Sequence, residues 1–191
     1  RSVTMAFVED IAALLKSKTI PMASHDEETI EDRNYYHHLG CRICEFPVNK
    51  ITAMEAVRLH DSIVFGAPNV LKGGSIYNRT SAREMIAEGL CHILASDYFY
   101  PSQLESVFLL DMEGVMPIEL GWDLISGNVA DALHLSDRGR IQEGKRADLV
   151  IVSCQGQNPE IIATIVKGNI VYLSDLNRIR NVPERELMYS K

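Results

Sequence analysis

The stretch SIVFGAPNVLKGGSIYNRTSAREMIAEGLCHILASDY, residues 62–98, contains a complete strand–loop–helix–strand unit. Apolar runs at 62–69 and 91–98 predict two strands. Between them, Ser81 and Glu84 have the spacing of a capping box that opens a helix. Strands that alternate with helices in this way are typical of βαβ units and a parallel sheet. The stretch therefore predicts an α/β fold.

The same alternation extends towards the amino terminus. It predicts helices over 5–18, 27–39 and 51–60 and strands over 19–26 and 41–48. Asp26 is expected to cap the second of these helices and Gly40 to end it. Thr52 and Glu55 have capping-box spacing at the start of the third. Four parallel strands are thus expected before Pro101.

After Pro101 the pattern changes. Two helices are expected at about 102–112 and 117–126, followed by paired strands within 160–173 with a turn at Gly168-Asn169. We therefore expect an α/β body over 1–130, a small β unit over 131–175 and a tail over 176–191.

The composition is that of an ordinary globular protein, with 191 residues, 46% hydrophobic and 24% charged. The net charge of −7 argues against broad nucleic-acid binding. No apolar run is long enough to span a bilayer, so no membrane association is expected. The charged first 20 residues do not resemble a signal peptide.

The four cysteines lie in or beside apolar runs: Cys41, Cys44, Cys91 and Cys154. This placement fits buried free thiols in a reducing compartment, so a cytoplasmic protein is expected. Cys41 and Cys44 form a C-x-x-C. If residues 41–48 are a strand, however, the two thiols point to opposite faces of the sheet.

Polar side chains occur where four predicted strands end. These positions are Ser24-His25-Asp26, Glu45, Asn69 and Ser96-Asp97-Tyr98. Ligands bind at this end of parallel sheets. Histidine and aspartate can ligate a divalent cation, and an aspartate there can take a proton from water. The pattern equally fits a hydrogen-bonded turn histidine with two helix-capping aspartates.

The loop that follows Asn69 combines cations, amides, a hydroxyl and two glycines. Its polar members are Lys72, Gly73, Gly74, Ser75, Asn78 and Arg79. Such a loop can hold phosphate groups with its cations and its closely approaching backbone. A solvated surface loop is the alternative.

Two long segments resemble the end of an amidohydrolase-superfamily chain: SGNVADALHLSDRGRIQEGKRADLVIV, from Ser126, and IIATIVKGNIVYL, which ends at Leu173. The motifs MASHDEET, EFP, GAPNVLKGGS, TSARE and LASDY, in this order, resemble the phosphonate-metabolism protein M family. The resemblance covers residues from about 20 to 173. It implies the second half of a (β/α)₈ TIM-type barrel followed by part of a small β-sandwich domain.

The resemblance also implies an activity. Members of this family are metal-dependent hydrolases of phosphonate metabolism. They convert ribose 1-methylphosphonate 5-triphosphate to pyrophosphate and the 5-phosphate. The implied cofactor is a divalent metal, with zinc expected. The implied partner is a small phosphorylated ribose phosphonate. His25 and Asp97 match metal ligands, with Asp97 catalytic, and the expected substrate contacts are Glu45, Asn69, Lys72, Gly73, Gly74 and Arg79.

The chain departs from the family pattern at three points. Glu45-Phe46-Pro47 stands where most amidohydrolases have a histidine, and Ile76 replaces the histidine that usually follows the glycine-rich loop. No His-x-His pair occurs, and about half of the family's length is absent. We therefore expect the isolated chain to be inactive and to associate, either as a homo-oligomer or with the missing amino-terminal half. Two other functions stay open, a deaminase or cyclic amidase acting on C–N bonds and a non-catalytic subunit.

Overall fold

The computed structural model describes residues 3–73, 81–154 and 158–174. The chain divides into two compact units, Arg1–Arg140 and Ile141–Lys191, and each is described by itself. Within the described residues, no helix is long and apolar enough to cross a membrane.

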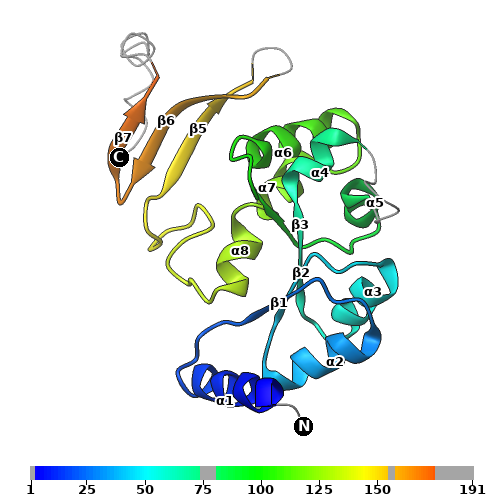
Figure 1. Ribbon diagram of the computed structural model, residues 1–191. Helices are drawn as coiled ribbons and strands as arrows, with labels where there is room; N and C mark the ends of the chain where they lie inside the picture. Colours follow the sequence, from blue (N-terminus) through cyan, green and yellow to red (C-terminus); the bar gives the residue numbers. More distant parts are fainter. Residues whose placement is uncertain (1–2, 74–80, 155–157, 175–191) are drawn as a thin grey trace, which may run out of the picture. The chain divides into compact units, whose positions relative to one another are not determined.

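The first unit contains a four-stranded parallel sheet, which confirms the α/β class (Figure 1). Its strands are β1 (Ala23–His25), β2 (Ile43–Glu45), β3 (Ser62–Gly66) and β4 (Ile93–Ala95), and they lie side by side in chain order. The helices are α1 (Val3–Ser17), α2 (Ile30–Leu39), α3 (Lys50–Arg58), α4 (Ala67–Lys72), α5 (Ala82–Ala87), α6 (Ser102–Met112), α7 (Ile118–Asp123) and α8 (Gly127–Ala132).

One face of the sheet is covered by several helices. Cys44, Ile63, Phe65 and Leu94 alternate with residues of the opposite face and belong to the largest hydrophobic cluster. This cluster also contains apolar side chains of α3, α4, α5 and α6. Because β2, β3 and β4 contribute residues to this core, burial of apolar surface fixes which face of these three strands points towards the helices.

The other face is covered by α8. Ile43, Val64 and Ile93 form a separate cluster with Val129 and Ala132 of that helix. Ile43 and Ile93 are the first residues of their strands, so α8 packs near the amino end of this face. In Figure 1, α8 lies on the opposite side of the strands from α3 and α5. Because α8 packs near the amino ends of the strands, it leaves their carboxyl ends free for a site.

The predicted end of the second helix is confirmed, but its predicted cap is wrong. Gly40 ends α2 in a left-handed conformation, with φ of 103°. Thr29, rather than Asp26, caps α2 in a reciprocal capping box with Asp32, at 3.0 and 3.1 Å. Asp26 instead donates its backbone N–H to the Glu45 carbonyl, so it still belongs to the sheet and lies too early to cap α2.

Two further caps were also predicted wrongly. Asn49 caps α3 and accepts from the Thr52 N–H at 3.0 Å, so Thr52 lies inside the helix. The Ser81 side chain makes no capping hydrogen bond to α5. Capping-box spacing alone does not decide which hydroxyl or amide reaches the free N–H groups of a helix.

The third strand is shorter than predicted. β3 ends at Gly66, and residues 67–72 form α4, with Pro68 in its first turn. Proline suits the first turn of a helix because its missing N–H has no intrahelical partner there. Asn69 therefore lies in α4 and not in a strand. The expected helix over 102–112 is confirmed, whereas the one over 117–126 ends at Asp123, and α8 was not expected.

The second unit contains one antiparallel sheet of β5 (Leu149–Ser153), β6 (Glu160–Val166) and β7 (Asn169–Leu173). Lys167 and Gly168 form the β6–β7 turn, and both have positive φ, 51° and 79°. The turn is thus one residue earlier than predicted. The conformation is that of the two-residue hairpin turn that matches strand twist.

The predicted burial of the four cysteines is confirmed for three of them. Cys41, Cys44 and Cys91 are buried, but Cys154 is exposed because it follows the last residue of β5. Cys41 packs with Met22 in one hydrophobic cluster and Cys44 belongs to another. This separation of the C-x-x-C thiols agrees with the predicted opposite faces.

Candidate functional site

The carboxyl ends of β1 and β2 are joined by hydrogen bonds. His25 and Glu45 are the last residues of these strands and are direct partners in the register. Beyond them the Asp26 N–H donates to the Glu45 carbonyl, and the Val48 N–H donates to the Glu27 carbonyl, both at 3.0 Å. The two loops are therefore fixed side by side.

Three residues at this end of the sheet have left-handed backbone conformations. Asp26 and Phe46 directly follow β1 and β2, with φ of 57° and 52°, and Asp97 lies two residues after β4 with φ of 50°. Such a conformation costs a non-glycine residue about 1–2 kcal/mol, most of all a bulky one such as Phe46. Strain of this kind concentrates at functional sites, which singles out these loops.

Phe46 was not predicted as a site residue, although it lies in the EFP motif. Its ring packs edge-on against His25, with ring centroids 5.1 Å apart and an interplanar angle of 84°. Its Cε1 is also close to Gly66, where an added Cβ would lie 3.6 Å away and 3.5 Å from Asn69 Nδ2. Phe46 thus brings together the end of β1, the end of β3 and the first turn of α4.

His25 has a defined partner. Its Nδ1 lies 2.9 Å from Asp26 Oδ2, and both side chains are half exposed, at 51% and 52%. When Nδ1 donates to this carboxylate, the neutral imidazole presents the Nε2 lone pair as its acceptor or ligand atom. The chemistry of His25 therefore fits a metal ligand, and it equally fits a histidine held at a turn.

Lys72 and Tyr98 connect the ends of β3 and β4. Lys72 is the last residue of α4, and its Nζ donates to Tyr98 Oη at 2.8 Å. The same Nζ lies 5.4 Å from the centroid of the tyrosine ring. Tyr98 directly follows Asp97, so the contact brings the predicted phosphate-binding lysine to the Asp97 loop. Tyr98 was not predicted as a binding residue.

Gly73 lies against another cation. Its φ is +69°, and an added Cβ would be 3.5 Å from the Arg83 guanidinium. Arg83 donates to the Val70 carbonyl at 2.6 Å and pairs with Glu113 at 2.5 Å, so it fixes the end of α4. The other four predicted members of this loop lie outside the described residues: Gly74, Ser75, Asn78 and Arg79.

The two predicted metal ligands lie far apart in the strand order. His25 belongs to β1 and Asp97 follows β4, and these strands form the two edges of the sheet. Among residues 3–73, 81–154 and 158–174, no group of three or more His, Cys, Asp or Glu side chains could hold a metal ion. His25 and Asp97 thus do not form a complete metal site within the described chain.

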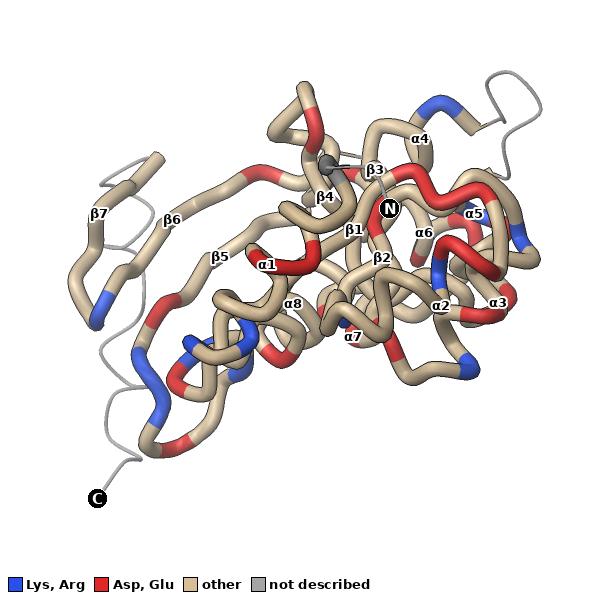
Figure 2. The backbone as a smooth tube through the Cα atoms, turned by 60° about the horizontal axis from the view of Figure 1, so that its bottom comes forward, with Lys and Arg blue, Asp and Glu red and all other residues tan. Residues whose placement is uncertain are grey.

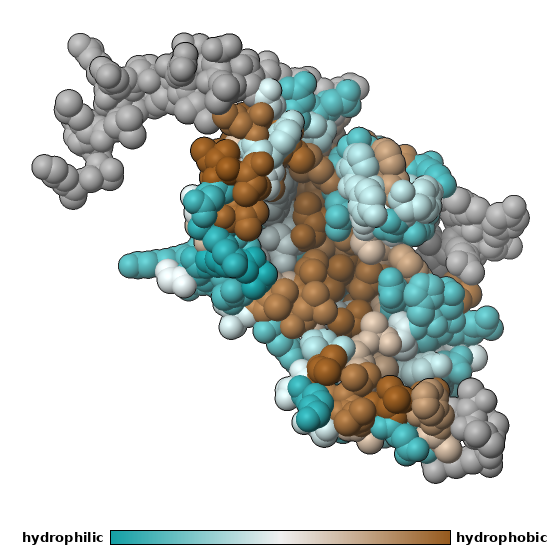
Figure 3. Space-filling view, turned by 60° about the vertical axis from the view of Figure 1, so that its left-hand side comes forward, coloured by the Kyte–Doolittle hydropathy of each residue, from teal (hydrophilic) through white to brown (hydrophobic). Residues whose placement is uncertain are grey.

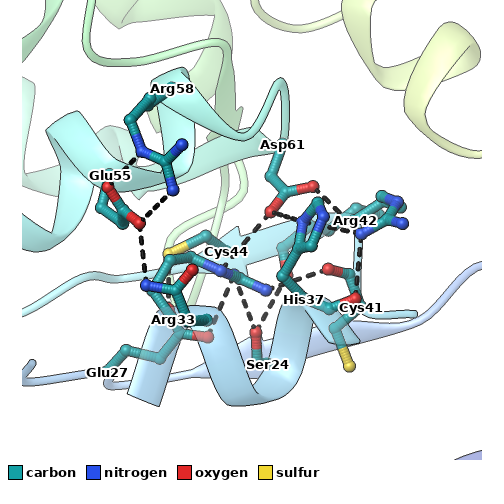
Figure 4. A network of polar contacts seen from close by, with 12 residues as sticks. Ser24, Glu27, Arg33, His37, Cys41, Arg42, Cys44, Glu55, Arg58 and Asp61 are labelled. Carbon is teal, nitrogen blue, oxygen red and sulfur yellow. Dashed lines mark hydrogen bonds and ion pairs between the residues drawn. The ribbon is translucent and has the colours of Figure 1, made fainter. Parts of the chain in front are cut away.

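A buried ionic network joins α2 to the loop that follows β1 (Figure 4). Arg33, on α2, is fully buried, and its Nη1 lies 3.0 Å from Glu27 Oε1. The same nitrogen donates to Ser24 Oγ at 3.1 Å, and Nη2 donates to the Cys41 carbonyl at 2.9 Å. Arg33 Nε also lies 3.5 Å from Asp61 Oδ2. One guanidinium therefore holds β1, its following loop and the approaches to β2 and β3.

Cys44 extends this network. Its thiol donates to Glu27 Oε2 at 3.2 Å. Burial, with the Glu27 carboxylate as a second cause, raises the pKa of Cys44 to about 12. The thiol thus stays protonated and acts as a hydrogen-bond donor. Glu27 is only two residues after His25, so this contact adds to the restraint on the loop.

Comparison with known proteins relates this arrangement to one family. The family model described as "Amidohydrolase family" matches residues 67–172. The chain is 42% identical over 146 residues to the alpha-D-ribose 1-methylphosphonate 5-triphosphate diphosphatase of Escherichia coli strain K12. That match covers 75% of this chain and 38% of the relative.

Solved structures show a similar fold at low identity. The A. niger ochratoxinase matches with a TM-score of 0.64 and 13% identity, over 85% of this chain and 44% of that chain. Enamidase, described as a member of the amidohydrolase superfamily, matches with a TM-score of 0.60 and 14% identity, over 89% and 52%. The chain spans less than two fifths of the E. coli relative and about half of each solved chain.

Proposed function

The chain belongs to the amidohydrolase family, and from this premise we propose that it is part of a hydrolase that releases pyrophosphate from ribose 1-methylphosphonate 5-triphosphate. The observation that carries the proposal is the 42% identity over 146 residues to a diphosphatase of that substrate. We also infer that the parallel sheet is one half of a (β/α)₈ barrel and that the second unit is part of a β-sandwich.

The proposed reaction consumes one water molecule. A water oxygen bonds to a phosphorus of the triphosphate, and the bridging P–O bond between the first and second phosphates breaks. Pyrophosphate leaves, and a monophosphate remains on the ribose. Asp97 is the proposed acceptor for the proton of the attacking water. Its place after β4, in a strained loop, supports this role.

Phosphate binding is assigned to cations and amides of the loop after β3. Lys72 and Arg79 would contact the triphosphate, with Glu45, Asn69, Gly73 and Gly74 as further substrate contacts. Lys72 is an exposed cation at the end of α4 (Figure 2), in a chain that is acidic as a whole. A cation in such a chain supports the assignment, because it can attract a phosphate group. Lysine and arginine form charge-assisted hydrogen bonds with phosphate oxygens.

Members of the amidohydrolase superfamily generally use divalent metals. We propose zinc as the metal, with His25 and Asp97 as ligands. A catalytic zinc normally has three protein ligands. A zinc held by His25 and Asp97 would therefore need a further ligand from outside the described residues. We therefore propose that the 191-residue chain alone does not turn over and that the active enzyme contains a complementary part. The buried free thiols support a cytoplasmic location.

A hybrid enzyme tests the function. In it, residues of this chain replace the 146 matched residues of the E. coli diphosphatase. Release of pyrophosphate from the triphosphate is measured beside release of ammonia from a panel of cyclic amides and aminated bases. The proposal predicts pyrophosphate and no ammonia. A folded hybrid that releases only ammonia would assign the chain to C–N bond hydrolysis.

A further inference from the structure

The contact between Lys72 and Tyr98 lies at the carboxyl ends of two neighbouring strands. Lys72 ends α4, which begins directly after β3, and Tyr98 lies three residues after the end of β4. The ammonium donates to the phenol oxygen at 2.8 Å, and it lies 5.4 Å from the ring centroid. Both side chains are exposed, Tyr98 by 67%. The pair therefore faces solvent where ligands bind to parallel sheets.

The direction of this hydrogen bond determines what the pair can bind. A lysine ammonium has three donor hydrogens and no acceptor, so two of its N–H groups remain for a ligand. Because the Tyr98 oxygen accepts from Lys72, the phenol O–H must point towards a different acceptor. The pair thus offers up to three donors to a ligand, two N–H and one O–H. Its fitting ligand is an anion with several oxygens on one centre.

Tyr98 also orders the lysine before a ligand arrives. A free lysine loses much of its rotamer freedom when it is fixed. The hydrogen bond and the ring contact restrict the ammonium in advance, so less of this entropy is lost on binding.

We propose that Lys72 and Tyr98 together bind one phosphate group of a polyphosphate, with Tyr98 as a second donor and as the residue that positions the lysine. The choice of a polyphosphate rests on the proposed function. The binding pair itself rests on the 2.8 Å contact and on its place at the ends of β3 and β4.

The test is calorimetric titration of the full 191-residue chain with tripolyphosphate at low ionic strength. Saturable binding of one tripolyphosphate is expected. Lys72→Met is expected to weaken the affinity by about 10-fold or more, since it removes the positive charge and its two N–H donors. Tyr98→Phe should weaken it by roughly 5- to 10-fold, since it removes one O–H donor. Tyr100→Phe is the matched control and should bind like the wild type.

The double variant separates positioning from direct binding. If Tyr98 orients the ammonium, the two changes together should cost less than the product of their separate fold-losses. Melting temperatures of all variants should stay within a degree or two of the wild type, since the pair is exposed. Wild-type affinity in Tyr98→Phe, or no saturable binding by the wild type, would overturn the proposal. A full product of losses would reject the positioning role.

Two controls keep the conclusions distinct. Sulfate at equal ionic strength should not displace tripolyphosphate at comparable concentrations, and equal competition by sulfate would reject polyphosphate as the ligand class. The titration needs no turnover. If the hybrid enzyme releases no pyrophosphate while Tyr98→Phe still weakens binding, the proposed function fails and the phosphate pair stands.

Discussion

Arg33 Nη1 lies 3.0 Å from Glu27 Oε1, and both side chains are completely buried. The pair joins α2 to the loop after β1, and Asp61, also buried, is a second carboxylate against the same guanidinium. The two carboxylates thus share one buried cation, and Asp61 also lies 2.8 Å from His37 Nδ1 and 3.7 Å from Arg42 Nη1. Since His25 precedes Glu27 by two residues, the pair also holds the loop that carries the candidate site.

Replacement of Arg33 should strongly destabilise the first unit. Arg33→Met leaves the Glu27 carboxylate buried without its cation, and Asp61 keeps only the partly exposed His37 and Arg42. Breaking such a buried pair costs about 3–5 kcal/mol. Urea unfolding at neutral pH measures the loss. Arg33→Met combined with Glu27→Gln should recover part of it, because one uncompensated charge is removed.

The matched control for this prediction is the Arg58–Glu55 pair, at 2.7 Å, in which the arginine side chain is 64% exposed. Arg58→Met should cost much less than Arg33→Met, since solvent screens the exposed guanidinium. Equal losses for Arg33→Met and Arg58→Met would show that the buried network does not hold the loop.

His92 gives the stability a pH dependence. Its Nδ1 accepts from the Ile63 N–H at 3.1 Å, and burial lowers the pKa of His92 below its ordinary 6.5. The unfolded chain therefore takes up this proton at a higher pH than the folded one. The stability contributed by neutral His92 is complete above pH 6.5 and is lost as the pH falls through the lowered pKa.

The variant His92→Asn isolates this effect, because asparagine keeps an acceptor near the position of Nδ1 and does not titrate. The free energy of unfolding should fall less between pH 7.5 and pH 5.5 in His92→Asn than in the wild type. Identical pH profiles for the two proteins would contradict the assigned role of burial.

The parallel sheet was predictable because the signal is distributed over many residues. Apolar runs such as 62–66 and 93–95 alternate with helical segments, and each run must bury its apolar surface. The ends of elements depend on single hydrogen bonds instead. Thr29 and Asn49 cap their helices because the chain turns at those residues, and their neighbours Asp26 and Thr52 have equally suitable side chains.

The candidate site was predictable in its strand-end positions but not in its contacts. His25 and Glu45 end their strands as expected. Phe46 was missed because its left-handed backbone, which aims the ring at His25, has no signature in the sequence. Arg33 was missed because it lies in a polar helical segment with no apolar stripe, where a charged side chain suggests a solvated surface.

The exposed apolar surface of α1 predicts that the chain associates with a partner. Phe7 and Leu14 are 64% and 54% exposed. Phe7 also lines a groove of about 400 Å³, together with Met22, which precedes β1, and Tyr36 of α2. Figure 3 shows hydrophobic residues gathered on this surface at the bottom of the view. β1 is in addition an edge strand of its sheet. Apolar surface next to an open edge favours a partner.

Sedimentation velocity at micromolar concentration tests the association. The chain should sediment as a dimer or larger species, and Phe7→Ser should shift it towards the monomer. Ile51→Ser, at an equally exposed residue of α3, is the control and should leave the distribution unchanged. A compact monomer at every concentration would contradict this prediction.

The most direct test of the central claim is the identity of the phosphorus products. The hybrid enzyme is incubated with ribose 1-methylphosphonate 5-triphosphate and a divalent metal, and the reaction is followed by ³¹P NMR. The account predicts equal amounts of pyrophosphate and a ribose 5-phosphate monoester, with no orthophosphate at early times. Orthophosphate with a 5-diphosphate, or an unchanged triphosphate in the presence of folded hybrid, would contradict it.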